Sequence, residues 1–141
     1  MKLQAIMLCI CGILFFNGGI PVSAAEVDAC TYDVIPRMMY IDAASANLAI
    51  SSNGIATVKS AVYGISGITT NVAISARIER YQNGRWVTVR TFDKDSSLFY
   101  LLLSEQCQVS NGYTYRVVAN VQAYTSSASE GRTVVSREVR Y

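Results

Sequence analysis

The chain has 141 residues, of which 51% are apolar and 16% charged, and its formal net charge is +2. This length suits one domain, and the composition is far from the low hydrophobicity and high net charge of disordered chains. A charge so close to zero creates no long-range field that would hold nucleic acid or an anionic membrane, so we expect neither as a partner of the mature protein.

The first 24 residues have the pattern of a cleavable signal peptide. Met1 and Lys2 form a short positive start, an apolar stretch follows over 3–16, and small residues that a signal peptidase reads end at Ala24. The apolar stretch is shorter than the roughly 20 residues of a membrane-spanning helix, which is the alternative. The sequence therefore predicts a signal-peptide helix over 1–24, cleaved near Ala24, and secretion of the rest.

Two of the four cysteines remain in the mature chain. Cys9 and Cys11 lie in the predicted leader, whereas Cys30 and Cys107 follow it. Because disulfides persist outside the reducing cytosol, we expect Cys30 and Cys107 to pair. Two separate buried thiols and a lipid anchor at Cys30 are the alternatives.

The mature chain divides into an N-terminal arm over 25–36 and one domain over 37–141. Alternation of apolar and polar residues, with turn signals every 8–12 residues, predicts about seven strands and an antiparallel β-sandwich. The predicted strands cover 37–43, 46–51, 55–63, a hairpin over 72–92, 98–109, 113–124 and 133–141. The predicted bends and polar loops cover 43–46, 93–97 and 125–132, and the large apolar residues of 98–109 predict that this strand is buried.

The clearest local signal is the dipeptide Asn83-Gly84 between two alternating runs, which is typical of a two-residue hairpin turn. Such a turn places Tyr81 opposite Trp86. The core-facing side of the hairpin is then expected to carry Ile74, Ala76, Ile78, Val87 and Val89. The opposite side is expected to carry Arg77, Glu79, Tyr81, Trp86, Thr88 and Arg90.

This outward side is the candidate binding face. Tyr81 and Trp86 should lie side by side there, with Arg77, Glu79 and Arg90 around them. An amphipathic aromatic pair on a solvated sheet suits a sugar ring or a partner surface. Cross-strand aromatic pairs also simply stabilise hairpins, so a structural role stays open beside the binding role.

The segment 109–117 resembles the penultimate strand of fibronectin type III-like and immunoglobulin-like sandwiches. An apolar residue, Val109, and a turn glycine, Gly112, precede a tyrosine and an alternating strand. The resemblance implies a tyrosine corner, whose hydroxyl bonds to upstream backbone, with Tyr115 as the corner residue and Tyr113 as the second choice.

More of the chain is similar to a family of small uncharacterised secreted proteins of Gram-positive bacteria. The matching features are the leader, the segment 34–41 (VIPRMMYI), the segment 81–86 (YQNGRW) and the strand over 112–124. The resemblance implies a sandwich fold and an extracellular bacterial location, and it brings no catalytic residues.

Several kinds of catalytic site are missing from the sequence. The chain has no histidine, which removes Ser-His-Asp triads, Cys-His pairs and the commonest zinc sites. Lys59 and Ser60 are neighbours on a predicted strand and should point to opposite faces, so they form no dyad. Asp93 and Asp95 offer oxygens to Ca²⁺, which needs six to eight ligands, but two acids around a lysine also suit a solvated loop. We expect no catalytic residue, no cofactor and no metal site.

The sequence thus predicts a secreted, non-enzymatic interaction or surface module whose partner is an extracellular protein or glycan. A glycan-binding module that uses the exposed aromatic pair is the first alternative. A small secreted hydrolase is the second, although the acidic residues are scattered along the chain and the sequence does not bring two of them together. The last strand could also accept a strand from another chain, although Arg137, Glu138 and Arg140 are equally typical of edge protection.

Overall fold

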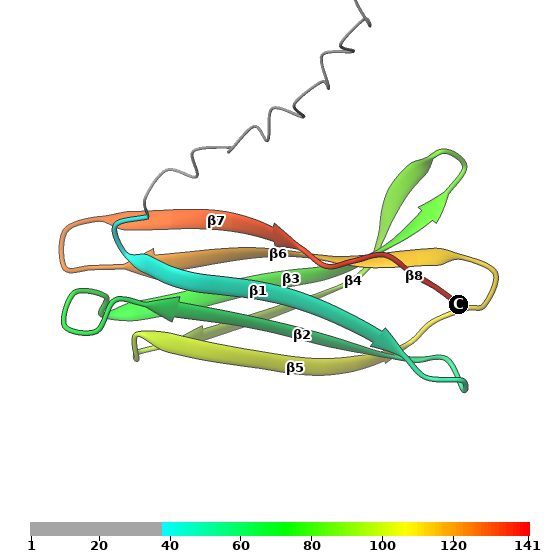
Figure 1. The fold of residues 1–141 in the computed structure, drawn as a ribbon, viewed down its shortest axis with the longest axis horizontal. Helices are drawn as coiled ribbons and strands as arrows, with labels where there is room; N and C mark the ends of the chain where they lie inside the picture. The colour runs from blue at the N-terminus through cyan, green and yellow to red at the C-terminus, as the bar shows by residue number, and fades with distance from the viewer. Residues whose placement is uncertain (1–37) are drawn as a thin grey trace, which may run out of the picture. The chain divides into compact units, whose positions relative to one another are not determined.

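The computed structural model describes residues 38–141, which form two antiparallel β-sheets packed face to face (Figure 1). The β-sandwich predicted from the sequence is confirmed. Among these residues, no helix is long and apolar enough to cross a membrane. The predicted leader over 1–24 and the arm over 25–36, including Cys30, lie outside the described residues.

The eight strands in this part of the chain are divided between a smaller and a larger sheet. The smaller sheet contains, in spatial order, β1 (Ile41–Ile50), β2 (Ile55–Gly64) and β5 (Tyr100–Gln108). The larger sheet contains, in spatial order, β4 (Arg85–Ser96), β3 (Asn71–Gln82), β6 (Thr114–Tyr124) and β7 (Ser129–Val135), and the short β8 (Val139–Arg140) also pairs with β6.

The core lies between the sheets because alternate residues of each strand point inward. Its members are mainly β-branched residues, which pack well on a pleated surface. The largest fully buried side chains are Tyr115, Ile74, Ile78, Val58, Val62, Val72, Val117 and Val121. All of them alternate with outward-facing residues, so the two outer faces carry polar groups, a few aromatic rings and some aliphatic side chains such as Leu102.

Tyr115 anchors the start of β6 to the turn before it. Its side chain is only 1% exposed, and its hydroxyl donates a hydrogen bond to the carbonyl oxygen of Ser110 at 2.6 Å. Tyr113 packs edge-on against it, with ring centres 6.4 Å apart. This is the geometry of a tyrosine corner, in which a buried ring and a backbone hydrogen bond hold one strand against the connection that precedes it.

Several predicted boundaries are wrong. β1 is continuous through the expected bend at 43–46, because a register shift after Ile41 absorbs the irregularity while pairing with β2 continues. β4 continues to Ser96 through the expected loop at 93–97, because its backbone stays paired with β3 and its polar side chains reach solvent. β7 begins within the expected loop at 125–132.

The predicted last strand over 133–141 is divided into β7 and β8. The division falls at Ser136, which is buried and whose hydroxyl accepts a hydrogen bond from the N–H of Val117 at 2.9 Å. The N–H of Ser136 still donates to the carbonyl oxygen of Val117, but the N–H of Val117 bonds to the serine hydroxyl instead of to a backbone carbonyl. The chain resumes regular pairing with β6 at Val139, which lies opposite Tyr115.

β5 is buried on one side only, contrary to the prediction for 98–109. Leu101 and Leu103 face the core, whereas Tyr100 and Leu102 are exposed on the other side. The reason is that none of the described elements covers the outer face of the smaller sheet, so the apolar run is half solvated.

The β3–β4 hairpin, whose tip extends beyond the two layers in Figure 1, is built on the predicted turn. Asn83 and Gly84 have φ angles of 52° and 76°, the left-handed conformations that a tight hairpin needs and that asparagine and glycine tolerate best. Tyr81 lies opposite Trp86, as predicted.

A β-bulge changes the register farther along the same hairpin. Glu79 pairs with Thr88, but Ile78 pairs with Arg90, so Val89 is the additional residue on β4. The prediction that Val89 faces the core is wrong, since its side chain is exposed. Directly opposed residues share a face, so Arg90 lies on the core side with Ile78 and not beside Tyr81.

We expect deletion of Val89 to be tolerated, with the free energy of unfolding changed by no more than about 1 kcal/mol. Without this residue, Thr88 and Arg90 alternate regularly and every other pair is kept. Deletion of Lys59, which is also exposed but lies in the regular central strand β2, should cost several kcal/mol because half of that strand would change faces. Urea titrations of the two variants compare them directly, and equal losses would contradict the assigned bulge.

Candidate functional site

The outer face of the larger sheet, formed by β4, β3 and β6, is the candidate functional surface. Its hairpin end carries four of the five residues proposed from the sequence, namely Arg77, Glu79, Tyr81 and Trp86. The fifth, Arg90, is a correction, because the bulge places it on the core side. There its guanidinium carbon lies 5.3 Å from the centre of the Phe92 ring.

Tyr81 and Trp86 lie in contact, with ring centres 5.2 Å apart and planes tilted by 58°. Tyr81 is 47% exposed, whereas Trp86 is partly buried. The guanidinium carbon of Arg116 lies 4.1 Å from the centre of the Trp86 ring, a cation–π contact. One side of the indole is therefore already covered by the protein, and Tyr81 is the aromatic ring that remains accessible.

Glu79 holds this cluster together. It lies on the predicted face but is only 6% exposed, between Arg77 and Arg116. Its two carboxylate oxygens accept hydrogen bonds from the Nε atoms of these arginines at 2.7 and 2.8 Å. Burial alone would raise the pKa of Glu79, but the hydrogen bonds and charges of the two arginines outweigh it and hold the pKa below its usual range.

Arg116 could not be assigned from the sequence. It reaches the site because β6 pairs with β3 with Glu79 opposite Arg116, a contact between residues distant in the chain. The alternation of 113–124 indicates that Arg116 is outward-facing. Only the strand order shows which outer face receives it.

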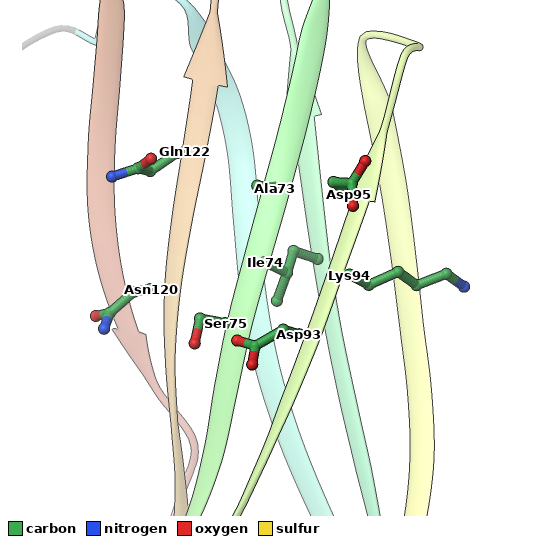
Figure 2. Close-up of a pocket in the computed structure, with 8 residues that line it drawn as sticks. All are labelled: Ala73, Ile74, Ser75, Asp93, Lys94, Asp95, Asn120 and Gln122. Atoms are coloured by element: carbon green, nitrogen blue, oxygen red, sulfur yellow. The ribbon is translucent and has the colours of Figure 1, made fainter.

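A hollow of about 450 Å³ lies farther along the same outer face (Figure 2). Asp93 and Asp95 of β4 border it on one side, Asn120 and Gln122 of β6 on the other, and Ser75 of β3 lies between them. These residues meet because Ser75 is paired with both Asp93 and Asn120. The sequence indicated the two aspartates as oxygen donors but did not connect them with β6.

The two sides of the hollow differ in hydrogen-bonding character. The amide oxygen of Asn120 accepts a hydrogen bond from Thr133 at 2.9 Å, and that of Gln122 accepts one from the hydroxyl of Tyr124. Both amides therefore keep NH₂ groups that can donate. The carboxylates of Asp93 and Asp95 have no hydrogen-bond or ion-pair partner among the described residues.

Lys94, which separates the two aspartates in sequence, also lines the hollow, but its side chain extends away from Asp93 and Ser75 (Figure 2). Its ammonium donates a hydrogen bond to the carbonyl oxygen of Leu102 at 3.2 Å, on the other sheet. The carboxylates are thus not neutralised by the lysine between them. Within residues 38–141, no group of three or more acidic, cysteine or histidine side chains is arranged to hold a metal ion.

A second aromatic pair, not proposed from the sequence, lies on the outer face of the smaller sheet. Tyr63 of β2 and Tyr100 of β5 are cross-strand partners with ring centres 6.4 Å apart and planes within 15° of parallel. They are 40% and 42% exposed, and the neighbouring Leu102 is 55% exposed. The sequence shows a tyrosine in each of the two strands, but it does not show that β2 pairs with β5 and so brings the two rings together.

Cys107, the described member of the predicted disulfide, is buried on the core side of β5. Burial raises the pKa of its thiol, and the positive charge of Arg90 opposes this rise. Cys30 lies outside the described residues, so the pairing stays a prediction, which a count of free thiols in the secreted protein tests.

The similarity to secreted proteins of Gram-positive bacteria also stays a prediction. No protein-family model matches the chain, and no curated protein matches it in sequence.

Proposed function

We propose that the protein is a secreted, non-enzymatic interaction module that binds an extracellular partner through the outer face of its larger sheet. One observation carries the proposal: the hollow bordered by Asp93 and Asp95 and the cluster around Glu79 lie on the same outer face of the sheet. The hollow offers polar groups that no described residue uses, and the cluster is held rigid by charge-assisted hydrogen bonds.

The chemistry of this face supports binding over catalysis. The chain has no histidine to act as a base. Asp93 and Asp95 stand on one strand and border the same side of the hollow, whereas glycosidases place their two carboxylates on either side of the bond that they break. The leader predicted from the sequence supports an extracellular location.

A second candidate is a protein partner that binds the opposite sheet. The exposed, nearly parallel rings of Tyr63 and Tyr100, with Leu102 beside them, favour it, because exposed apolar patches mark interaction surfaces. The two candidates use opposite faces of the sandwich, and a matched pair of variants separates them.

The test is a pull-down from the extracellular material of the source organism with protein starting at Ala25. Wild type is compared with Tyr81→Ala/Trp86→Ala and with Tyr63→Ala/Tyr100→Ala, each checked for folding by thermal unfolding. We expect the first variant to lose most of the capture and the second to keep it.

Because each variant removes one cross-strand aromatic pair from one outer face, the comparison controls for a general loss of stability. Loss of capture only in Tyr63→Ala/Tyr100→Ala would move the function to the smaller sheet. Capture of nothing by wild type would reject the proposed function.

A further inference from the structure

We infer that the hollow bordered by Asp93, Asp95, Asn120 and Gln122 is a subsite for a neutral sugar residue of a glycan. The inference rests on the proposed function and specifies its ligand. It moves sugar recognition away from Trp86, whose ring is partly covered by Arg116, to a polar site farther along the same face.

The arrangement of donors and acceptors favours a ligand with hydroxyl groups. Asp93 and Asp95 can only accept hydrogen bonds when ionised, whereas the NH₂ groups of Asn120 and Gln122 can only donate. Ser75, between the two sides, has a hydroxyl that does both. A sugar hydroxyl donates and accepts at the same time. Because the amides of Asn120 and Gln122 are directed toward β7 and away from Asp93 and Asp95 (Figure 2), the hydroxyls of adjoining sugar residues are needed to satisfy both sides of the hollow together.

Charge narrows the class of ligand further. An anionic ligand would face two carboxylates that no lysine or arginine neutralises, since Lys94 points to the other sheet. A metal ion would find only these two carboxylates, because no third acidic, cysteine or histidine side chain is grouped with them within residues 38–141, and Ca²⁺ needs six to eight oxygen ligands. A neutral polyhydroxylated ligand meets neither obstacle.

The dimensions suit a glycan longer than one residue. About 450 Å³ lies within the usual range of small-ligand sites. Ser75 and Tyr81 lie on the same face of β3, about 20 Å apart at the rise of a β-strand. A bound sugar in the hollow would therefore need several further residues to reach the exposed Tyr81 ring, and short and long glycans should differ in their dependence on that ring.

The experiment is a glycan array of neutral and anionic oligosaccharides, followed by calorimetric titration of the best-bound neutral oligosaccharide. We expect binding to neutral members, none to the anionic ones, and no change when EDTA is added. Asp93→Asn/Asp95→Asn should weaken binding at least about tenfold, because two charged acceptors are lost while the shape is kept.

Two further variants keep the test decisive. Ser75→Phe should abolish binding by filling the hollow, and Glu105→Gln, which removes an exposed acid from the smaller sheet, should leave it unchanged. Equal affinity of wild type and Asp93→Asn/Asp95→Asn, preference for anionic glycans, or loss of binding in EDTA would overturn the inference.

The glycan array and the pull-down together distinguish failure of the sugar subsite from failure of the proposed function. If no glycan binds but the pull-down still captures a partner through the Tyr81 face, the sugar subsite is wrong and the interaction module stands. If neither experiment finds a ligand, both proposals are rejected.

Discussion

Tyr115→Ala should lower the free energy of unfolding by about 4 kcal/mol, the largest loss that we expect from one substitution in this chain. The residue is 1% exposed and belongs to the core, and its hydroxyl donates a hydrogen bond to the carbonyl oxygen of Ser110. Truncation leaves a cavity between the sheets and removes the contact that holds β6 to the turn before it. Urea denaturation of the domain gives the value directly.

Tyr115→Phe is the matched control, since it removes only the hydroxyl. We expect a loss of about 1 kcal/mol, that of one hydrogen bond to a backbone carbonyl. Tyr113→Phe should be nearly neutral, because the Tyr113 hydroxyl makes no hydrogen bond to any of residues 38–141. A larger loss of stability for Tyr113→Phe than for Tyr115→Phe would show that Tyr113, and not Tyr115, is the corner residue.

Glu79→Gln should destabilise the protein by about 2 kcal/mol at neutral pH, the second-largest loss that we expect from one substitution. The substitution keeps the shape but leaves Arg77 and Arg116 without the charge that holds them. Arg116 should then leave the Trp86 ring. Trp86 is the only tryptophan of the chain, so its fluorescence reports this change separately from stability.

The effect of Glu79→Gln should depend on pH in one direction. The pKa of Glu79 is lowered in the folded state from an ordinary value of 4.5, so its charge stabilises the fold above that value. The contribution is lost as the pH falls through the lowered pKa. The difference in stability between wild type and Glu79→Gln should therefore be greatest at neutral pH and shrink in acid, whereas a constant or growing difference would contradict the ion-pair account.

A second carboxylate must be allowed for in that measurement. Glu130 accepts hydrogen bonds from the N–H groups of Met39, Tyr40 and Ile41 at 2.8–3.1 Å. Burial raises the pKa of Glu130, but the three backbone hydrogen bonds together outweigh burial, so the pKa lies below its ordinary value. Wild type and Glu79→Gln both contain Glu130, so its acid transition cancels in the difference between them.

The local parts of the fold could be predicted from the sequence because local chemistry determines them. Asn83 and Gly84 demand a tight turn, and the turn places Tyr81 opposite Trp86. The pattern before Tyr115 indicated a buried ring whose hydroxyl bonds to upstream backbone. In each case the residues that decide the structure are close together in the chain.

The errors arise where the structure depends on pairing between distant segments. A turn determines register only up to the first bulge, so the extra residue Val89 moved Arg90 to the core side. The sequence predicts a loop at Asp93, because nothing in it shows that Asp93 pairs with Ser75. It also does not show that Ser75 pairs with Asn120 on its other side. The hollow therefore could not be predicted, because its polar residues stand on three strands whose order the sequence does not show.

The measurement that tests the central claim most directly is amide chemical-shift mapping by NMR, with the captured partner or the best-bound oligosaccharide titrated into the protein. The account predicts that the largest shifts gather on β3, β4 and β6, around Ser75, Asp93 and Asn120. Shifts gathered instead on β2 and β5, around Tyr63 and Tyr100, would contradict it and assign binding to the opposite face of the sandwich.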